Sequence, residues 1–143
     1  MDMNKKLVAG VLAVAAGIPI VSVLHDAWAK HSATEDKEKV MSMALGSFQN
    51  AMDIRGATQH LIRDREFCGD ATRTLSHDTE FRKNLREEFV TKSRALLAID
   101  PTYKSEIETE RELVKSYLDI ADRTHVNIVE ACKMSDALGT FKP

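Results

Sequence analysis

The sequence has few residues that interrupt helices: three prolines and six glycines occur in 143 residues. After the apolar segment near the N-terminus, Pro101 is the only proline before the last residue. Aromatic residues are also scarce, at 6% of the chain. Glu, Lys, Arg, Ala and Leu, which are strong helix formers, are abundant in the same region. This composition predicts an all-α fold.

Neither sign of charge dominates, because 20 basic and 22 acidic residues leave a net charge of −2. The basic residues are dispersed along the chain rather than gathered in one stretch. Proteins that bind nucleic acid usually carry a concentrated basic surface. The sequence therefore predicts no nucleic-acid partner.

Motifs that carry catalysis or bind metals are missing. The chain has no CxxC, HExxH, GxSxG, Glu-x-x-His or glycine-rich phosphate loop. The nearest approaches are Asp122-x-x-His125 and the i,i+4 pair His60 and Asp64, which we interpret as a solvated surface pair. We therefore expect a non-enzymatic protein with no catalytic residues, no metal ligands and no cofactor.

One long apolar run stands out, from Leu7 to Leu24, after Lys5 and Lys6. Eighteen residues in a helix span roughly 27 Å, close to the thickness of the hydrocarbon core of a bilayer. The positive-inside rule keeps the two lysines in the cytoplasm and places the rest of the chain outside it. The run predicts a single-pass helix in a bacterial inner membrane, followed by a periplasmic domain.

Two fates fit the N-terminal segment, residues 1–29. As an uncleaved signal anchor, it would hold the protein in the membrane, and the length of the run favours this interpretation. As a signal peptide, it would be cleaved after Ala29, because Ala27-Trp28-Ala29 has the small-x-small pattern. Cleavage would release a soluble periplasmic protein.

Residues 30–138 predict three amphipathic helices. The first begins at Thr34, which resembles an N-cap, and runs to about Glu66 before a polar connector over 69–78. The second begins at Ser76 or Asp78 and ends at Ile99, and the third covers about 102–134. Short links between long helices predict an antiparallel bundle. Residues 30–34 are the expected break from the N-terminal helix, and residues 139–143 are expected to be frayed.

Apolar residues recur every three or four positions along each predicted helix. In the third helix, Ile107, Val114, Ala121 and Ile128 follow a strict interval of seven, which predicts coiled-coil-like packing. The inward-facing residues also include Val40, Ala44, Ser47, Ala51, Phe81, Leu85, Phe89, Ser93 and Leu96, with Leu113 and Ile120 alongside the third stripe.

The two cysteines test this layout. Cys68 falls at the predicted end of the first helix and Cys132 near the end of the third, so an antiparallel bundle brings both to one pole. In an oxidising compartment, two cysteines at one pole predict a disulfide.

These features favour an envelope protein whose bundle binds another protein, as an accessory subunit, an assembly factor or a phage- or plasmid-type inhibitor. The membrane, through residues 7–24, and a second copy of the chain are the other partners considered. The alternative is a bundle that senses a small molecule or a metal. It would need polar groups that face inward, such as Arg55, Arg63 or Arg86.

Overall fold

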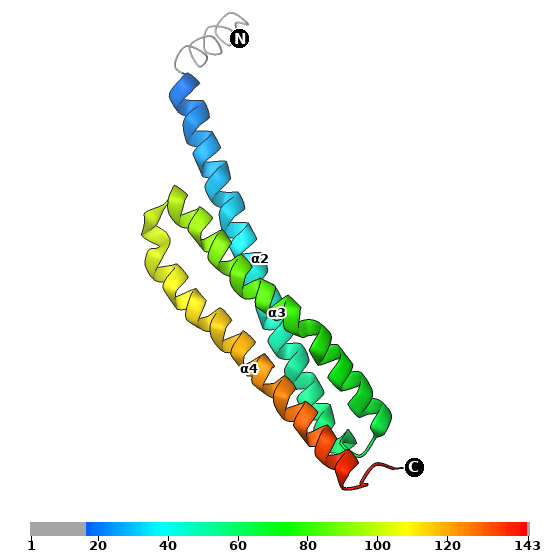
Figure 1. The fold of residues 1–143 in the computed structure, drawn as a ribbon. Coiled ribbons are helices and arrows are strands. Elements are labelled where there is room, and N and C mark those ends of the chain that lie inside the picture. The colour runs from blue at the N-terminus through cyan, green and yellow to red at the C-terminus, as the bar shows by residue number, and fades with distance from the viewer. Residues whose placement is uncertain (1–16, 143) are drawn as a thin grey trace, which may run out of the picture.

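Three long helices pack side by side in the computed structural model, which describes residues 17–142 (Figure 1). They run up, down and up, and the described part of the chain contains no strand. The all-α, three-helix architecture predicted from the sequence is therefore confirmed. In chain order the elements are α2 (Gly17–Leu61), α3 (Arg65–Ile99), the 3-10 turn η1 (Pro101–Tyr103) and α4 (Lys104–Ala137).

Helix α2 passes without a break through residues 30–34, where the sequence predicts an interruption. The Thr34 hydroxyl does not cap a helix; it donates a hydrogen bond to the Lys30 carbonyl, 2.9 Å away and one turn earlier. A threonine in the interior of a helix can make this bond to the carbonyl four residues earlier, and the helix continues through it. The predicted N-cap at Thr34 is wrong for this reason.

The first turn of the bundle lies earlier than predicted, because α2 ends at Leu61 and α3 begins at Arg65. Asp64 sets this boundary: its carboxylate accepts a hydrogen bond from the Phe67 N–H at 3.0 Å, which makes it the N-cap of α3. The expected connector at 69–78 is therefore helical. Gly69, the first residue of that expected connector, lies near the start of α3.

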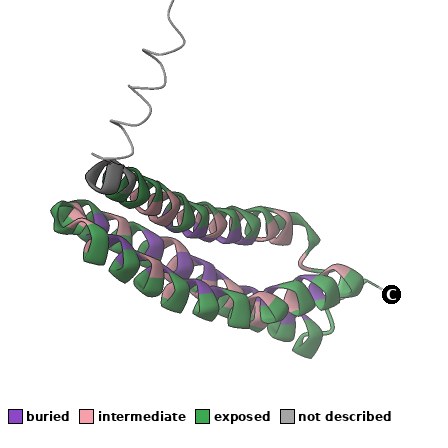
Figure 2. Ribbon diagram, turned by 90° about the horizontal axis from the view of Figure 1, so that it is seen from above, coloured by how far each residue is buried: buried purple, intermediate pink, exposed green. Residues whose placement is uncertain are grey.

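The core repeats every seven residues in all three helices, and the buried residues form the inner strips seen in Figure 2. In α4 the predicted stripe is confirmed, since each of its four members is at most 3% exposed. A heptad repeat of this kind produces the packing of a left-handed coiled coil. The repeating positions are Lys37, Ala44 and Ala51 in α2, Cys68, Leu75, Arg82, Phe89 and Leu96 in α3, and Ile107, Val114, Ala121, Ile128 and Ser135 in α4.

Some residues predicted to face inward lie outside the core. Phe81 is 44% exposed and Leu113 is 42% exposed, whereas Leu118 is completely buried. A helix in a three-helix bundle contacts two neighbours, so its buried arc is wider than a single stripe. In α4, Tyr117 contacts Phe48 of α2, with ring centroids 5.2 Å apart, while the adjacent Leu118 packs with the buried residues of all three helices.

The difference in burial between Leu113 and Leu118 gives a stability prediction. Leu118→Ala should lower the free energy of unfolding by roughly 2–5 kcal/mol, because it removes buried methyl groups and leaves a cavity. Leu113→Ala should lower it by less than about 1 kcal/mol, since its side chain is partly solvated already. Urea denaturation followed by far-UV circular dichroism measures both. Equal losses would contradict the assignment of Leu118 to the core.

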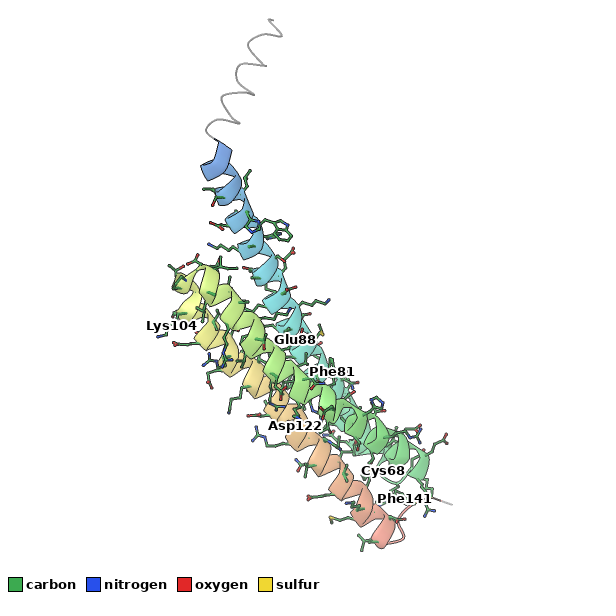
Figure 3. All side chains as sticks on the ribbon, turned by 45° about the horizontal axis from the view of Figure 1, so that its top comes forward. Cys68, Phe81, Glu88, Lys104, Asp122 and Phe141 are labelled. Atoms are coloured by element: carbon green, nitrogen blue, oxygen red, sulfur yellow. A yellow bond between two sulfur atoms is a disulfide. The ribbon has the colours of Figure 1, made fainter. Side chains whose placement is uncertain are left out.

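The two cysteines form a disulfide, as predicted, with Cα atoms 5.8 Å apart. Cys132 lies near the end of α4, but Cys68 lies in α3 rather than at the end of the first helix. The pole assignment holds because the start of α3 and the end of α2 meet at the same turn. In Figure 3, Cys68 and Phe141 lie at one end of the bundle and Lys104 at the other.

The C-terminal tail is held to this pole, although the sequence predicts fraying over 139–143. Gly139 has a φ of +62°, and its N–H donates to the Asp136 carbonyl while the Thr140 N–H donates to that of Ser135. This pair of bonds is the Schellman motif, which ends a helix with a left-handed residue. The Lys142 N–H then donates to the Arg63 carbonyl at 2.9 Å. The tail therefore ties the end of α4 to the α2–α3 turn.

At the opposite pole, α2 extends beyond the tips of α3 and α4 (Figure 1). The thirteen residues from Gly17 to Ala29 measure about 20 Å as a helix. Val23, Leu24 and Trp28 are each about two-thirds exposed. Residues 7–16 of the predicted membrane run lie outside the described residues. Within 17–142, no helix is both long and apolar enough to cross a membrane.

Candidate functional site

Three groups of ion pairs that join helices each include a buried or half-buried charged side chain. The first group lies at the pole from which α2 extends. There the Lys30 ammonium binds the Asp100 carboxylate at 2.7 Å and lies 5.0 Å from the centre of the Tyr103 ring. The hydrogen bond from Lys30, with two more from Thr102, lowers the pKa of Asp100 to about 2. Asp100 thereby caps η1 and joins the α3–α4 turn to α2.

The second group contains a buried lysine. The Lys37 side chain is completely buried, and its ammonium binds both Glu110 and Glu106 of α4, the latter at 3.1 Å. Burial by itself would lower the pKa of Lys37, but the hydrogen bonds to Glu110 and Glu106 outweigh it and the pKa is raised. Lys37 is therefore a permanent cation that links α2 to α4.

The third group is a network between α3 and α4. The buried Arg82 guanidinium donates through Nε to Asp122 at 2.5 Å, and Arg86 donates to Asp122 at 2.7 Å and to Asp119 at 2.9 Å. Asp122 lies on α4 where that helix meets α3 (Figure 3). The hydrogen bond from Arg86 lowers the pKa of Asp119 despite its partial burial. Lys115 closes the network at 3.1 Å from Asp119.

His125 adjoins this network but is not placed to act as a general base. Its Nδ1 lies 3.4 Å from Arg82 Nη2, a group that can only donate, so Nδ1 is the acceptor. In the neutral ring the proton then resides on Nε2, which faces the Ser76 hydroxyl at 3.4 Å. We assign this tautomer from its neighbours. A protonated Nε2 cannot abstract a proton from Ser76, so the arrangement does not activate a serine nucleophile.

The pKa of His125 is lowered, first by burial and then by the charge of Arg82, although Asp122 and Asp78 act in the opposite direction. As the pH falls below about 6.5, the unfolded chain binds a proton that the folded state resists. The free energy of unfolding should therefore fall as the pH drops below about 6.5. His125→Gln should flatten this dependence, measured by urea denaturation across that range, and His60→Gln is the matched control at an exposed histidine. An unchanged slope in His125→Gln would refute the contribution of His125.

The polar residues singled out by sequence do not converge on one site. Arg55, Arg63 and His60 are exposed, and only Arg86 is half-buried between helices. Asp64 is no partner of His60; it is the N-cap described above.

Asp64→Ala should accordingly lower the free energy of unfolding by about 1 kcal/mol, measured by urea denaturation. An unchanged free energy of unfolding would contradict the N-cap role of Asp64. A solvated surface residue would show no such loss.

Lys37 and Arg82 were missed by the sequence reasoning, although the heptad pattern contains them. Lys37 precedes Ala44 by seven residues, and Arg82 lies seven residues after Leu75 and seven before Phe89. A heptad pattern that allows charged residues at its buried positions predicts both as core residues. In the described part of the chain, no three His, Cys, Asp or Glu side chains gather in a way that could hold a metal ion.

Comparisons with known proteins add no relative: no family model matches the sequence, and neither the curated proteins nor the solved structures yield a match.

Proposed function

We propose that the chain is a membrane-anchored envelope protein whose disulfide-linked bundle binds another protein in the periplasm. The observation that supports this best is the single helix α2, which continues from the core of the bundle into the second half of the predicted apolar run. Its exposed Val23, Leu24 and Trp28 suit the boundary between lipid and water, where tryptophan is enriched. The described part of the predicted anchor, residues 17–24, then belongs to the same helix as the first helix of the bundle.

The positions of the ion pairs and the disulfide support the same arrangement. Lys30, which binds Asp100, follows Trp28 by two residues, or about 3 Å along the helix. The α3–α4 turn would therefore lie beside the membrane surface. The disulfide, at the far pole, would face the periplasm, an oxidising compartment in which such bonds persist.

Protein binding is the favoured activity because the buried and half-buried cations between the helices already bind carboxylates. Lys37, Arg82 and Arg86 are each held by carboxylates of α4, and their role is to join helices. The bundle offers long, solvated helical surfaces of the kind that other proteins bind.

Topology is tested with alkaline phosphatase fused after Pro143, where we expect an active enzyme, and with a cytoplasmic reporter at the same position, where we expect none. The opposite result would overturn the proposal. Intact-mass measurement of the membrane-extracted protein distinguishes an anchor from a mature form beginning at Lys30. Binding is tested by purification from detergent-solubilised membranes, with a stoichiometric envelope protein as the expected result. A protein recovered alone from its native membrane would refute protein binding while leaving the topology intact.

One observation favours the alternative of a small-molecule-binding bundle. Arg86, alone among the three arginines considered from the sequence, lines a groove between α3 and α4.

A further inference from the structure

The groove beside Arg86 is a surface depression of about 220 Å³ between α3 and α4. Its floor is apolar and comes from both helices: Phe89 and Val90 of α3 and Val114 of α4. Phe89 and Val114 are fixed in the core, whereas Val90 is 36% exposed. Val90 therefore supplies the exposed apolar surface of the groove, and Phe89 and Val114 form the packed layer beneath it.

The rim of this groove carries an excess of positive charge. Arg86, Arg111 and Lys115 contribute three cations, and Asp119 contributes one carboxylate, which leaves two positive charges in excess. Asp119 binds Arg86 and Lys115, while Arg111 makes no ion pair with any residue in 17–142. Arg111 therefore retains its hydrogen-bond donors for a ligand.

We propose that this groove binds an organic carboxylate that carries a compact apolar group. The apolar group would rest on Val90, above the buried Phe89 and Val114. The carboxylate would accept hydrogen bonds from Arg111, whose guanidinium suits the paired oxygens of a carboxylate. The volume is below the roughly 300–1,000 Å³ of most ligand pockets, so the ligand is small, with about one ring or a short chain. Lys115 is well exposed and can turn toward the same carboxylate.

Arg86 forms a fixed part of the wall of this groove. Its guanidinium is fixed by Asp119 and Asp122 rather than free to fold back into solvent. Burial alone would lower the pKa of Arg86, but the hydrogen bonds to Asp119 and Asp122 raise it. Arg86 is thus a fixed part of the groove wall whose charge is balanced by Asp119 and Asp122, while Arg111 supplies both the direct contact and the charge that no carboxylate in 17–142 pairs.

The test uses the full chain in detergent, labelled with ¹³C at valine methyl groups, and titrated with benzoate or with benzyl alcohol. Benzoate should shift the methyl signals of Val90 and Val114, with an affinity roughly tenfold higher than that of benzyl alcohol, because only benzoate carries the charge. The methyl signals of Val126, which lies elsewhere on α4, should not move. Equal effects of the two compounds would overturn the proposal, as would the absence of any shift.

Arg111→Gln removes the charge of an exposed side chain and should reduce benzoate affinity about tenfold without unfolding the bundle. Arg94→Gln is the matched control, because Arg94 is an exposed arginine of α3 outside the groove. Benzyl alcohol should bind both variants as it binds the parent protein. If benzoate affinity is unchanged in Arg111→Gln, or falls equally in Arg94→Gln, the carboxylate contact at Arg111 is refuted.

Discussion

Replacing both cysteines, as Cys68→Ala with Cys132→Ala, should lower the free energy of unfolding by about 4 kcal/mol. The bond joins residues 64 positions apart, so it removes many conformations from the unfolded chain. In the chain-entropy model that restriction is the main source of stabilisation. Urea denaturation of the oxidised parent and the double variant, followed by circular dichroism, gives the difference.

Reduction provides the control for this experiment. The parent protein in excess reductant should lose nearly as much stability as the double variant, because both lack the covalent link. A double variant within about 1 kcal/mol of the oxidised parent would contradict the expected contribution. Peptide mapping of protein taken from its native compartment tests the bond itself: two alkylatable thiols would refute both the disulfide and the oxidising location that we propose.

Arg82→Ala should lower the free energy of unfolding by roughly 3 kcal/mol, the second large effect. The substitution removes a buried side chain and takes one cation away from Asp122. Arg86 continues to bind the other oxygen of Asp122, so the loss should fall toward the lower end of the range for broken buried pairs. Urea denaturation at pH 7 measures it.

The comparison with Arg82→Met separates the two causes of this loss. Methionine fills much of the space without the charge, and apolar replacement of buried ionic groups is often tolerated. We therefore expect Arg82→Met to be more stable than Arg82→Ala. Arg94→Ala, at an exposed arginine, should change stability by no more than about 0.5 kcal/mol. If Arg82→Ala behaves like Arg94→Ala, the network does not stabilise the bundle.

The architecture was predictable because long helices with few interruptions leave few alternatives. The interval of seven from Ile107 to Ile128 was sufficient to predict coiled-coil packing, and the burial of these residues agrees with it. The α2–α3 boundary was not predictable from the same pattern. The sequence pattern predicts a helix end at about Glu66 and a solvated Asp64, whereas the hydrogen bond from the Phe67 N–H makes the Asp64 carboxylate the N-cap of α3.

The polar network was harder to predict, because its members are distant in the sequence. Arg82 and Asp122 are 40 residues apart, and nothing local marks them as partners. A rule that places charged residues outside the core also predicts exposed positions for Lys37 and Arg82. Both are buried because their charged groups bind carboxylates of α4. The groove at Arg111 depends on the alignment of α3 with α4, which a one-dimensional pattern does not specify.

The uninterrupted helix α2 has a mechanical consequence. Residues 17–61 form one helix. The direction in which the bundle faces around the helix axis is therefore fixed relative to the exposed segment that contains Trp28. Each residue added between Trp28 and the bundle would rotate the bundle by about 100° about the helix axis and move it about 1.5 Å further from Trp28. An insertion of seven would restore the original facing to within about 20° and raise the bundle by roughly 10 Å. The length of α2 therefore sets both the direction in which the bundle faces and its distance from the exposed segment.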